Sequence, residues 1–230
     1  MNVLIIGGSS DIGINLAKFL VNNNYNVIST YHKNEFKLDK VDTLECDVRD
    51  EKEIENTIKY GINKYGKIDI LINMSAIYMD NSFLNKTKNE FMNVLEVNLV
   101  GTFLCNQIYS RYIDDGMIVN ISSTDGIDTY NEYNIDYSAS KAGIINISKS
   151  ISRCTNNKVL CICPNWIDSD STRSMNKEYL DSELKRVGQD RLITIGELIS
   201  GIYKIINMNC KSGSIYRIDI REGKLWIEEI

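Results

Sequence analysis

The sequence predicts one α/β domain built on a doubly wound parallel sheet. Apolar segments of strand length alternate along the chain with longer segments of helical periodicity. One of them, residues 68–73, is almost continuously apolar, as expected of a parallel strand that helices cover on both faces. The 230 residues contain no Gly/Ser-rich or Pro-rich linker and no internal repeat, so we expect residues 1–230 to form a single domain.

The first elements form a strand, a turn, a helix and a second strand. Residues 1–6 are a short apolar run, and the turn that follows begins and ends with glycine, at Gly7 and Gly13. An amphipathic segment at residues 14–21 is the expected helix, and residues 26–30 are the second strand. Two strands joined through a helix are expected to pair in parallel with a right-handed crossover.

The same alternation continues along the rest of the chain. In order, we expect a strand at 43–46, a helix at 51–65, a strand at 68–73, one long helix or two at 91–112, a strand at 116–121, a helix at 137–148, a strand at 158–163, a helix at 195–208 and a strand at 214–219. Parallel sheets of this kind bind ligands just beyond the carboxyl ends of their strands. The polar residues that directly follow each strand are therefore the candidates for a functional site.

Composition restricts the classes of partner. A formal net charge of -5 argues against nucleic acid or an anionic membrane surface as a partner. The apolar run at residues 3–6 is too short for a signal peptide or a membrane span, so we expect a cytoplasmic protein. The six cysteines contain no C-x-x-C pair and His32 is the only histidine, so we expect no metal site and free, buried thiols. Cys161 and Cys163 are expected on the same side of a strand.

Tyr137 and Lys141 are four residues apart on an expected helix, so their side chains share one face. A phenol with an ordinary pKa of about 10 exchanges protons poorly at neutral pH, and a neighbouring ammonium favours its ionised form. The pair is thus a candidate for proton transfer. A tyrosine and a lysine one turn apart are also common on protein surfaces, so the interpretation depends on the rest of the chain.

The glycine turn is a candidate phosphate site. A strand that leads into Gly7 and then into a helix beginning near Gly13 places free backbone amides and the positive end of the helix dipole together. Glycine lets the backbone approach a pyrophosphate closely. The same spacing also suits an ordinary turn. The expected contacts are Gly7, Ser9, Ser10, Asp11, Ile12 and Gly13.

Together these features resemble the short-chain dehydrogenases/reductases over nearly all of the chain. The family motif T-G-x-x-x-G-x-G corresponds to residues 6–13, with Ile6 in place of threonine and Asp11 in place of the middle glycine. The family motif Y-x-x-x-K corresponds to Tyr137 and Lys141. The resemblance implies a Rossmann-like fold and hydride transfer between a nicotinamide and a carbonyl or alcohol. We expect the Asp11 side chain to turn outward or to cap the helix.

The resemblance also implies two further catalytic residues. The family's serine falls in residues 120–126, where position favours Ser123 and Ser122 is the alternative, and its asparagine corresponds to Asn98. In this scheme Tyr137 protonates the carbonyl oxygen and Ser123 positions it. Lys141 stabilises the tyrosinate and reaches the nicotinamide ribose, and Asn98 holds a water that relays the proton.

Other positions are implied to contact the cofactor. Tyr31, His32 and Lys33 follow the second strand with no acidic residue before Glu35, which favours NADP(H) over NAD(H), although NAD(H) stays open. Asp47 is expected to accept from the adenine amino group beside Val48. The remaining implied contacts follow later strands and are Asn73, Ser75, Pro164, Ile167 and Ser169, together with Tyr137 and Lys141.

Two family motifs are altered, and the substrate is left open. The family's N-N-A-G is Asn-Met-Ser-Ala at residues 73–76, and its P-G is Pro164-Asn165.

Residues 170–189 are expected to cover the substrate or to form a surface helix pair. Lengths and element order are most similar to the 3-oxoacyl-[acyl-carrier-protein] reductases, which implies a carrier-bound carbonyl and fatty acid biosynthesis. A sugar, pteridine or small ketone, or a non-catalytic NADP(H) sensor, remain alternatives. We expect a homotetramer or homodimer.

Overall fold

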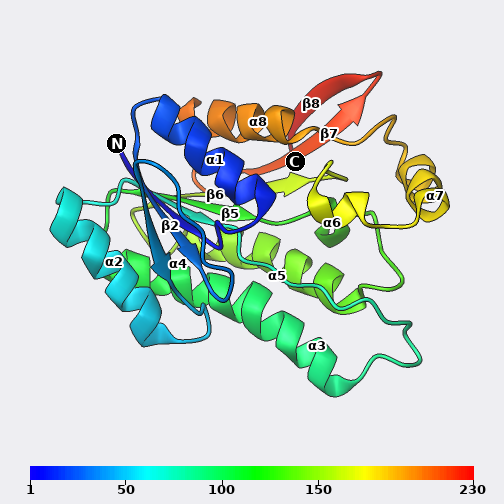
Figure 1. Ribbon diagram of the computed structural model, residues 1–230, viewed down its shortest axis with the longest axis horizontal. Helices are drawn as coiled ribbons and strands as arrows, with labels where there is room; N and C mark the ends of the chain where they lie inside the picture. Colours follow the sequence, from blue (N-terminus) through cyan, green and yellow to red (C-terminus); the bar gives the residue numbers. More distant parts are fainter.

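A computed structural model describes all 230 residues and confirms the predicted α/β fold class (Figure 1). Eight strands form one sheet in the order β3-β2-β1-β4-β5-β6-β7-β8, and the first seven strands are parallel. The strands are β1 (Asn2–Ile6), β2 (Asn26–Tyr31), β3 (Val41–Glu45), β4 (Ile70–Asn73), β5 (Met117–Ile121), β6 (Lys158–Pro164), β7 (Ile215–Arg221) and β8 (Lys224–Glu229).

Helices cover both faces of the sheet, as the apolar strands require. Helices α1 and α8 lie on one face, and α2, α4 and α5 lie on the other (Figure 1). The helices are α1 (Asp11–Asn22), α2 (Glu51–Tyr65), α3 (Lys88–Leu95), α4 (Gly101–Tyr112), α5 (Ile135–Ile151), α6 (Asp170–Arg173), α7 (Lys177–Val187) and α8 (Ile195–Asn207), with a π-helix, η1 (Glu96–Val100), between α3 and α4 and a 3₁₀ turn, η2 (Thr124–Gly126), after β5.

The hydrophobic core is divided by the sheet. A cluster that includes Leu16, Leu20 and Ile202 packs α1 and α8 against one face. A second cluster, with Ile58 and Tyr109 among its members, packs α2 and α4 against the other.

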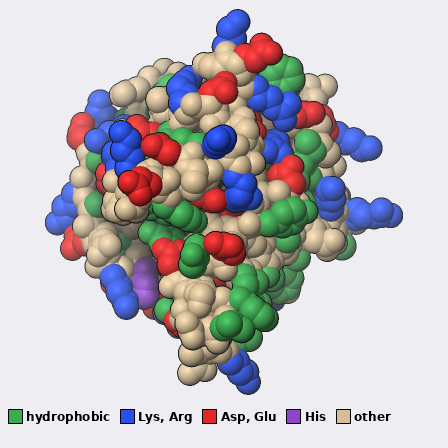
Figure 2. Space-filling view, turned by 90° about the vertical axis from the view of Figure 1, so that its right-hand side faces the viewer, with side chains coloured by type: hydrophobic (Ala, Val, Ile, Leu, Met, Phe, Trp, Pro, Cys, Tyr) green, Lys and Arg blue, Asp and Glu red, His purple; other side chains and the backbone are tan.

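No helix is long and apolar enough to cross a bilayer. On the face in Figure 2, acidic and basic side chains are intermixed over most of the surface.

Strand β8 is absent from the prediction and pairs antiparallel with β7. The two-residue hairpin turn places Glu222 and Gly223 at φ of 51° and 70°. Both values suit a type I′ turn, for which Asn-Gly is the usual signal and Glu-Gly is a weak one. The expected final strand, residues 214–219, is therefore only the first part of a hairpin.

Two other expectations are refined by the structure. The long segment 91–112 is one continuous helical rod in which the π-helix separates α3 from α4. Cys161 and Cys163 lie on the same side of β6 with their sulfurs 4.0 Å apart, as predicted. All six thiols are free, but Cys154 is exposed, so the expectation of burial is wrong for that residue because it lies past the end of α5.

Candidate functional site

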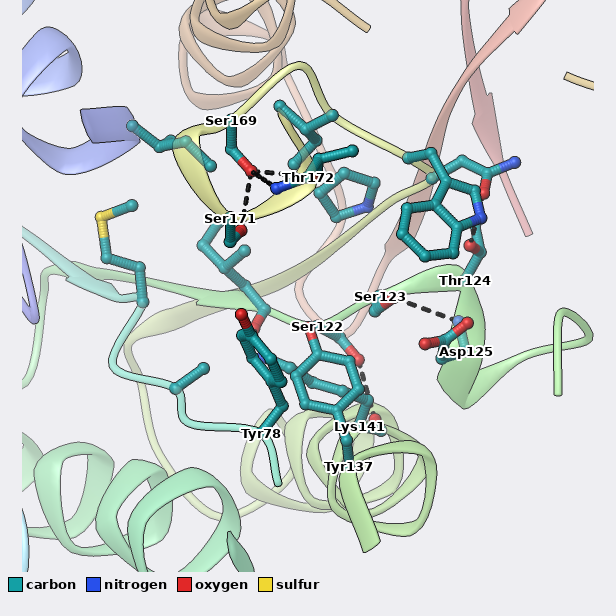
Figure 3. A pocket seen from close by; sticks show the side chains of 18 of the residues that line it. Tyr78, Ser122, Ser123, Thr124, Asp125, Tyr137, Lys141, Ser169, Ser171 and Thr172 are labelled. Atoms are coloured by element: carbon teal, nitrogen blue, oxygen red, sulfur yellow. Dashed lines mark hydrogen bonds between the residues drawn. The ribbon is translucent and has the colours of Figure 1, made fainter. Parts of the chain in front are cut away.

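A cavity of about 290 Å³ opens at the carboxyl ends of the parallel strands (Figure 3). This is the edge at which a doubly wound sheet is expected to bind ligands. Ten of the predicted site residues line the cavity, drawn from segments that are distant in the sequence. They are Ser10, Asp11, Ile12, Ser122, Ser123, Tyr137, Lys141, Pro164, Ile167 and Ser169.

Tyr137 and Lys141 lie side by side on α5, as their spacing predicts. The Lys141 ammonium is 5.3 Å from the centre of the Tyr137 ring, and it donates a 2.9 Å hydrogen bond to the carbonyl oxygen of Ile121 at the end of β5. Lys141 is buried, and Tyr137 is half-buried and lines the cavity. The two groups therefore present a phenol and a fixed ammonium to one space.

The structure distinguishes the two candidate serines. The hydroxyl of Ser122 is buried and donates a 2.8 Å hydrogen bond to the carbonyl oxygen of Lys141. The Ser123 hydroxyl lies on the cavity side near Tyr137 and accepts a 3.1 Å hydrogen bond from the Asp125 N–H (Figure 3). Its geometry favours Ser123 as the hydroxyl that meets a bound ligand.

The electrostatics of the pair differ from the sequence-based expectation. Burial raises the pKa of Tyr137 above its ordinary value, the charge of Asp125 raises it further, and a hydrogen bond with Ser123 acts in the opposite direction. Burial lowers the pKa of Lys141 to about 8. The expected lowering of the tyrosine pKa by Lys141 is therefore wrong, because burial is the largest cause of the shift and Lys141 is not among its causes. The phenol is held as a proton donor.

Asn98 occupies the π-helix, a feature that is frequent at functional sites. Its side-chain amide donates to the carbonyl oxygen of Ile77 at 2.9 Å and to the Ser140 hydroxyl at 3.1 Å, and its oxygen accepts from the Ile77 N–H at 2.8 Å. Because both N–H donors are used, only a lone pair of the oxygen is left for the expected water. The side chain mainly joins the segment after β4 to α5.

The glycine turn has no room for side chains at its first positions. Gly7 has a φ of 79°, and a Cβ there would lie 2.5 Å from the Ser75 Cα. A Cβ on Gly8 would collide with the Ser29 hydroxyl, and one on Gly13 would lie 2.6 Å from the Gly8 Cα. Glycine is thus required for the turn to pack this closely, and the turn brings the amino-terminal end of α1 to the cavity, where a pyrophosphate is expected.

The side chains of this turn cap α1 and cross the cavity. Ser10 is the N-cap residue and accepts a hydrogen bond from the Gly13 N–H at 3.1 Å. Asp11 accepts from the Ile12 N–H at 2.9 Å and, through its other oxygen, from the Asp170 N–H of α6 at 2.8 Å. Asp11 therefore bonds the first turn of α1 and also reaches across the cavity to α6, instead of turning outward. Ser9 lies in the turn but does not line the cavity.

The ends of β2 and β3 present basic groups. His32 and Lys33 are exposed, and Tyr31 packs edge-on against Phe36. Asp47 accepts from Arg49 through both carboxylate oxygens, at 2.9 and 2.6 Å, which lowers the pKa of Asp47 to about 2. The expected acceptor for adenine is therefore already paired. Neighbouring Val48 is buried against Gly101 in the hydrophobic core and does not line the cavity.

Asn73 is not brought into the cavity. It is buried below the sheet edge and donates to the side-chain oxygens of Asn106 and Asn120, at 2.6 and 2.8 Å. The structure thus gives this amide a packing role, whereas a cofactor contact is expected from the motif. Ser75 lies against Gly7, and Ser169 is the N-cap of α6, accepting from the Thr172 N–H at 3.3 Å.

Several cavity residues were not singled out from the sequence. Asp125 and Trp166 both belong to segments that follow strands, so their position was an available signal. Tyr78, Asn131 and Asn134 come from loops whose course depends on tertiary contacts, and nothing local marks them. The expected cover at residues 170–189 consists of the short α6 and the longer α7, and α6 contributes Ser171 and Thr172 to the cavity wall.

The family model of the short chain dehydrogenases matches residues 1–180. The chain belongs to the short-chain dehydrogenase/reductase family. It is an oxidoreductase of that family, and the resemblance seen in the sequence is confirmed. The chain is similar to the 3-oxoacyl-[acyl-carrier-protein] reductase FabG of Staphylococcus aureus, with 30% identity over 211 residues that cover 82% of this chain and 85% of that protein.

Other relatives agree with this assignment. The 3-oxoacyl-[acyl-carrier-protein] reductase of Synechocystis is 28% identical over 192 residues, which cover 76% of this chain and 77% of the relative. Among solved structures, ligand-free aldohexose dehydrogenase AldT of Thermoplasma acidophilum has a TM-score of 0.77 and 24% identity, covering 88% of this chain and 85% of its own. ElxO with NADP bound has a TM-score of 0.79 and 23% identity, covering 94% and 96%. These two structures show the shared fold.

Proposed function

We propose that this short-chain dehydrogenase/reductase transfers hydride between NADP(H) and a carbonyl compound or its alcohol. The convergence of Ser123, Tyr137 and Lys141 on one cavity carries the proposal. The tight glycine turn before α1 suits a pyrophosphate, because it places the amino-terminal end of that helix, at Ser10 and Asp11, in the cavity wall. When bound, the nicotinamide supplies or accepts the hydride.

The residues of the chain handle the oxygen and its proton. The raised pKa keeps the Tyr137 phenol protonated at neutral pH, so it carries a proton that the oxygen of a carbonyl can accept during reduction. The Ser123 hydroxyl orients that oxygen. Lys141, buried beside the ring, supplies positive charge to the tyrosinate that proton transfer leaves behind.

A carrier-bound 3-oxoacyl group is the first substrate that we propose to test, with a place in cytoplasmic fatty acid biosynthesis. The FabG relatives support this choice. A sugar, pteridine or small ketone is the alternative. NADPH oxidation should be followed at 340 nm with a panel that contains acetoacetyl-CoA, aldoses and ketones.

Tyr137→Phe is the decisive variant of that assay. It should lower turnover by at least about 100-fold, because a general acid contributes on the order of 10² to 10⁴, while the dissociation constant for NADPH stays unchanged. Tyr130→Phe is the matched control, since Tyr130 is 73% exposed in a nearby loop. NADPH binding without turnover of any carbonyl would favour the sensor over the enzyme. Turnover that survives Tyr137→Phe would contradict the assigned role.

We propose NADP(H) over NAD(H) from the basic residues after β2. Lys33 and His32 are exposed after β2, where a ribose 2′-phosphate would approach, and residues 32–34 contain no acidic side chain. The fold relative ElxO was solved with NADP bound, which agrees with this choice. Lys33→Glu should weaken NADPH binding by at least about tenfold, since contacts to a charged group contribute roughly 1.5–3 kcal/mol, and should leave NADH binding nearly unchanged. Lys211→Glu, on an exposed loop, controls for net charge. Equal losses for both cofactors would contradict the proposal.

We propose a homo-oligomer, either a tetramer or a dimer. The α3–α4 rod exposes four large hydrophobic side chains, Met92, Val100, Phe103 and Tyr112. Exposed apolar side chains of this kind favour association with a second copy. Small-angle scattering should give a mass of at least two chains, and a monomer at micromolar concentration would contradict the expectation.

A further inference from the structure

Asp125 is an acidic residue in the wall of the cavity that the mechanism above leaves without a role. It lies in η2, directly after the segment that carries Ser123, and its backbone N–H donates to the Ser123 hydroxyl (Figure 3). Figure 3 shows its carboxylate at the same opening as Ser123 and Tyr137. A charged group thus stands beside the place where a carbonyl would react.

The position of this carboxylate is fixed by packing. Gly126 lies so close to α5 that a Cβ would be 2.5 Å from the carbonyl carbon of Lys141, so η2 is seated on the helix that carries the catalytic pair. The Thr129 hydroxyl donates to one carboxylate oxygen, Oδ1. A side chain held at two points presents its remaining oxygen in a defined direction.

The second oxygen, Oδ2, forms neither a hydrogen bond nor an ion pair with the chain. The charged groups around Asp125 are Lys141 of α5 and Arg186 and Glu183 of α7. Arg186 is already paired with Glu183 at 2.6 Å and donates to the carbonyl oxygen of Thr129, and Lys141 donates to Ile121. Burial raises the pKa of Asp125. Because Oδ2 is not among the buried side-chain atoms and Asp125 lines the cavity, this oxygen is free to accept a hydrogen bond from a ligand.

Two further residues that line the cavity are Asn134 and Trp166. The side-chain oxygen of Asn134 is buried without a hydrogen-bond partner, while its amide nitrogen donates to Asp80 at 2.5 Å. Because the Asn134 oxygen is shielded, the Asp125 carboxylate is the acceptor of the two that a ligand can reach, and Trp166 adds an aromatic surface; this combination suits a compact ligand that carries a hydroxyl group.

Resting on the proposed function, we propose that Asp125 binds a hydroxyl group of the substrate and so selects a hydroxylated, sugar-like carbonyl compound or polyol. A neutral donor is favoured over an ammonium because Lys141 and Arg186 already supply positive charge near the carboxylate. A plain acyl chain has no donor beside its carbonyl, so it would displace water from Oδ2 without replacing the hydrogen bond. The inference thus favours the sugar-like alternative over the 3-oxoacyl thioester.

The test compares two ketones that differ by one group. Hydroxyacetone and 2-butanone are reduced with NADPH. Erythrulose is added as a polyhydroxylated ketone, and acetoacetyl-CoA is added as a thioester whose acyl group carries no hydroxyl. For the wild type, kcat/KM should be at least about tenfold higher for hydroxyacetone than for 2-butanone, as a hydrogen bond to a charged group predicts. Asp125→Val should lower that ratio by at least about tenfold, and Asp125→Asn should lower it less.

Control variants and further readouts separate this role from others. Asp181→Asn and Asp181→Val change an exposed acid on α7 and should leave the ratio unchanged. Thermal melting and NADPH titration verify that each variant folds and binds cofactor. If Asp125 acted only by raising the pKa of Tyr137, the Asp125 variants would change kcat/KM for both ketones by the same factor and would shift the pH dependence of kcat/KM. That result would overturn the inference.

The remaining outcomes distinguish this inference from the proposed function. An unchanged ratio in the Asp125 variants would overturn the inference alone, and so would turnover of acetoacetyl-CoA with no reduction of hydroxyacetone or erythrulose. Absence of NADPH binding, or turnover that survives Tyr137→Phe, would overturn the proposed function itself.

Discussion

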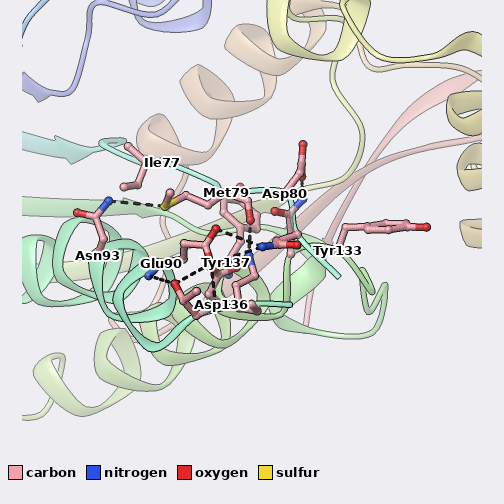
Figure 4. A network of polar contacts seen from close by, with 12 residues as sticks. Ile77, Met79, Asp80, Glu90, Asn93, Tyr133, Asp136 and Tyr137 are labelled. Carbon is pink, nitrogen blue, oxygen red and sulfur yellow. Dashed lines mark hydrogen bonds and ion pairs between the residues drawn. The ribbon is translucent and has the colours of Figure 1, made fainter. Parts of the chain in front are cut away.

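The buried ion pair between Lys86 and Asp136 gives a quantitative prediction (Figure 4). The Lys86 ammonium is 2.9 and 3.1 Å from the two carboxylate oxygens, and the side chains are 5% and 0% exposed. Lys86 also donates to the carbonyl oxygen of Met79, and Asp136 accepts from the Tyr137 N–H at 3.0 Å. The pair thus fastens the segment after β4 to the first turn of α5, next to the catalytic tyrosine.

Lys86→Met leaves the carboxylate buried with one backbone donor. Removing one member of such a pair costs about 3–5 kcal/mol, because the remaining charge is neither solvated nor paired. The free energy of unfolding of a typical domain is only about 5–15 kcal/mol, so a large part of the stability should be lost. Guanidinium unfolding at 25 °C measures the change. The turnover number should fall with it, since the same segment positions Tyr137.

Two further variants make the reasoning refutable. Lys86→Met combined with Asp136→Leu removes both charges and should recover much of the loss, as apolar replacement of buried pairs often does. Lys88→Met changes an exposed lysine in the same region and should leave unfolding unchanged. A loss below about 1 kcal/mol for Lys86→Met, against the 3–5 kcal/mol expected for a broken buried pair, would refute the argument. So would a double variant that is as unstable as the sum of the single ones.

Three further predictions concern the glycine turn and the pH profile. Reduction requires the Lys141 ammonium and the Tyr137 phenol. Since the pKa of Lys141 is about 8 and that of Tyr137 is raised, kcat/KM should be flat below pH 7 and fall above pH 8. A profile that stays flat to pH 10 would contradict this. Gly8→Ala should cost about 1–3 kcal/mol of unfolding free energy by overpacking. Adding Ser29→Ala should restore part of that loss, because the clashing hydroxyl is buried without a partner. A double variant whose loss of unfolding free energy equals the sum of the two single losses would argue against the clash. Asp11→Gly frees the Ile12 N–H and removes a negative charge beside the expected phosphate site. Calorimetry should therefore show NADPH binding about threefold tighter, as expected for one screened charge pair. Weaker binding would contradict this and would mean that the hydrogen bond from Asp11 to α6 contributes more to NADPH binding than the negative charge costs.

The parts of the fold that could be predicted depend on local patterns. Most of the parallel strands are short apolar runs, although β3 mixes apolar and polar residues, and the positions of Tyr137 and Lys141 follow from helical spacing alone. Strand β8 depends on pairing with β7 and begins at a weak turn signal, so local sequence does not mark it. The pKa of Tyr137 was predicted in the wrong direction because spacing reveals a neighbour but not the extent of burial.

The same limit explains why motif matching assigned Asn73 to the cofactor. A motif reports that an amide stands after a strand, and the direction of that amide depends on what the adjacent elements offer. Here Asn106 of α4 and Asn120 of β5 supply two acceptors beneath the sheet edge. Asn98 is similar, because the π-helix turns its amide onto the backbone of Ile77. Both residues are placed by contacts from distant parts of the chain.

Helix α5 shows how a fold can fix the geometry of a proton-transfer pair. Its inward stripe is mostly polar, with Asp136, Ser140, Ile144 and Ser148 at intervals of four residues and all buried. An apolar stripe would tolerate small rotations of the helix, whereas these side chains have specific partners: Lys86, Asn98 and Asn120 bond Asp136, Ser140 and Ser148 in turn. Because every partner comes from a different element, a rotation of α5 would break several buried hydrogen bonds at once. The polar stripe therefore sets the rotation at which Tyr137 and Lys141 both reach the cavity.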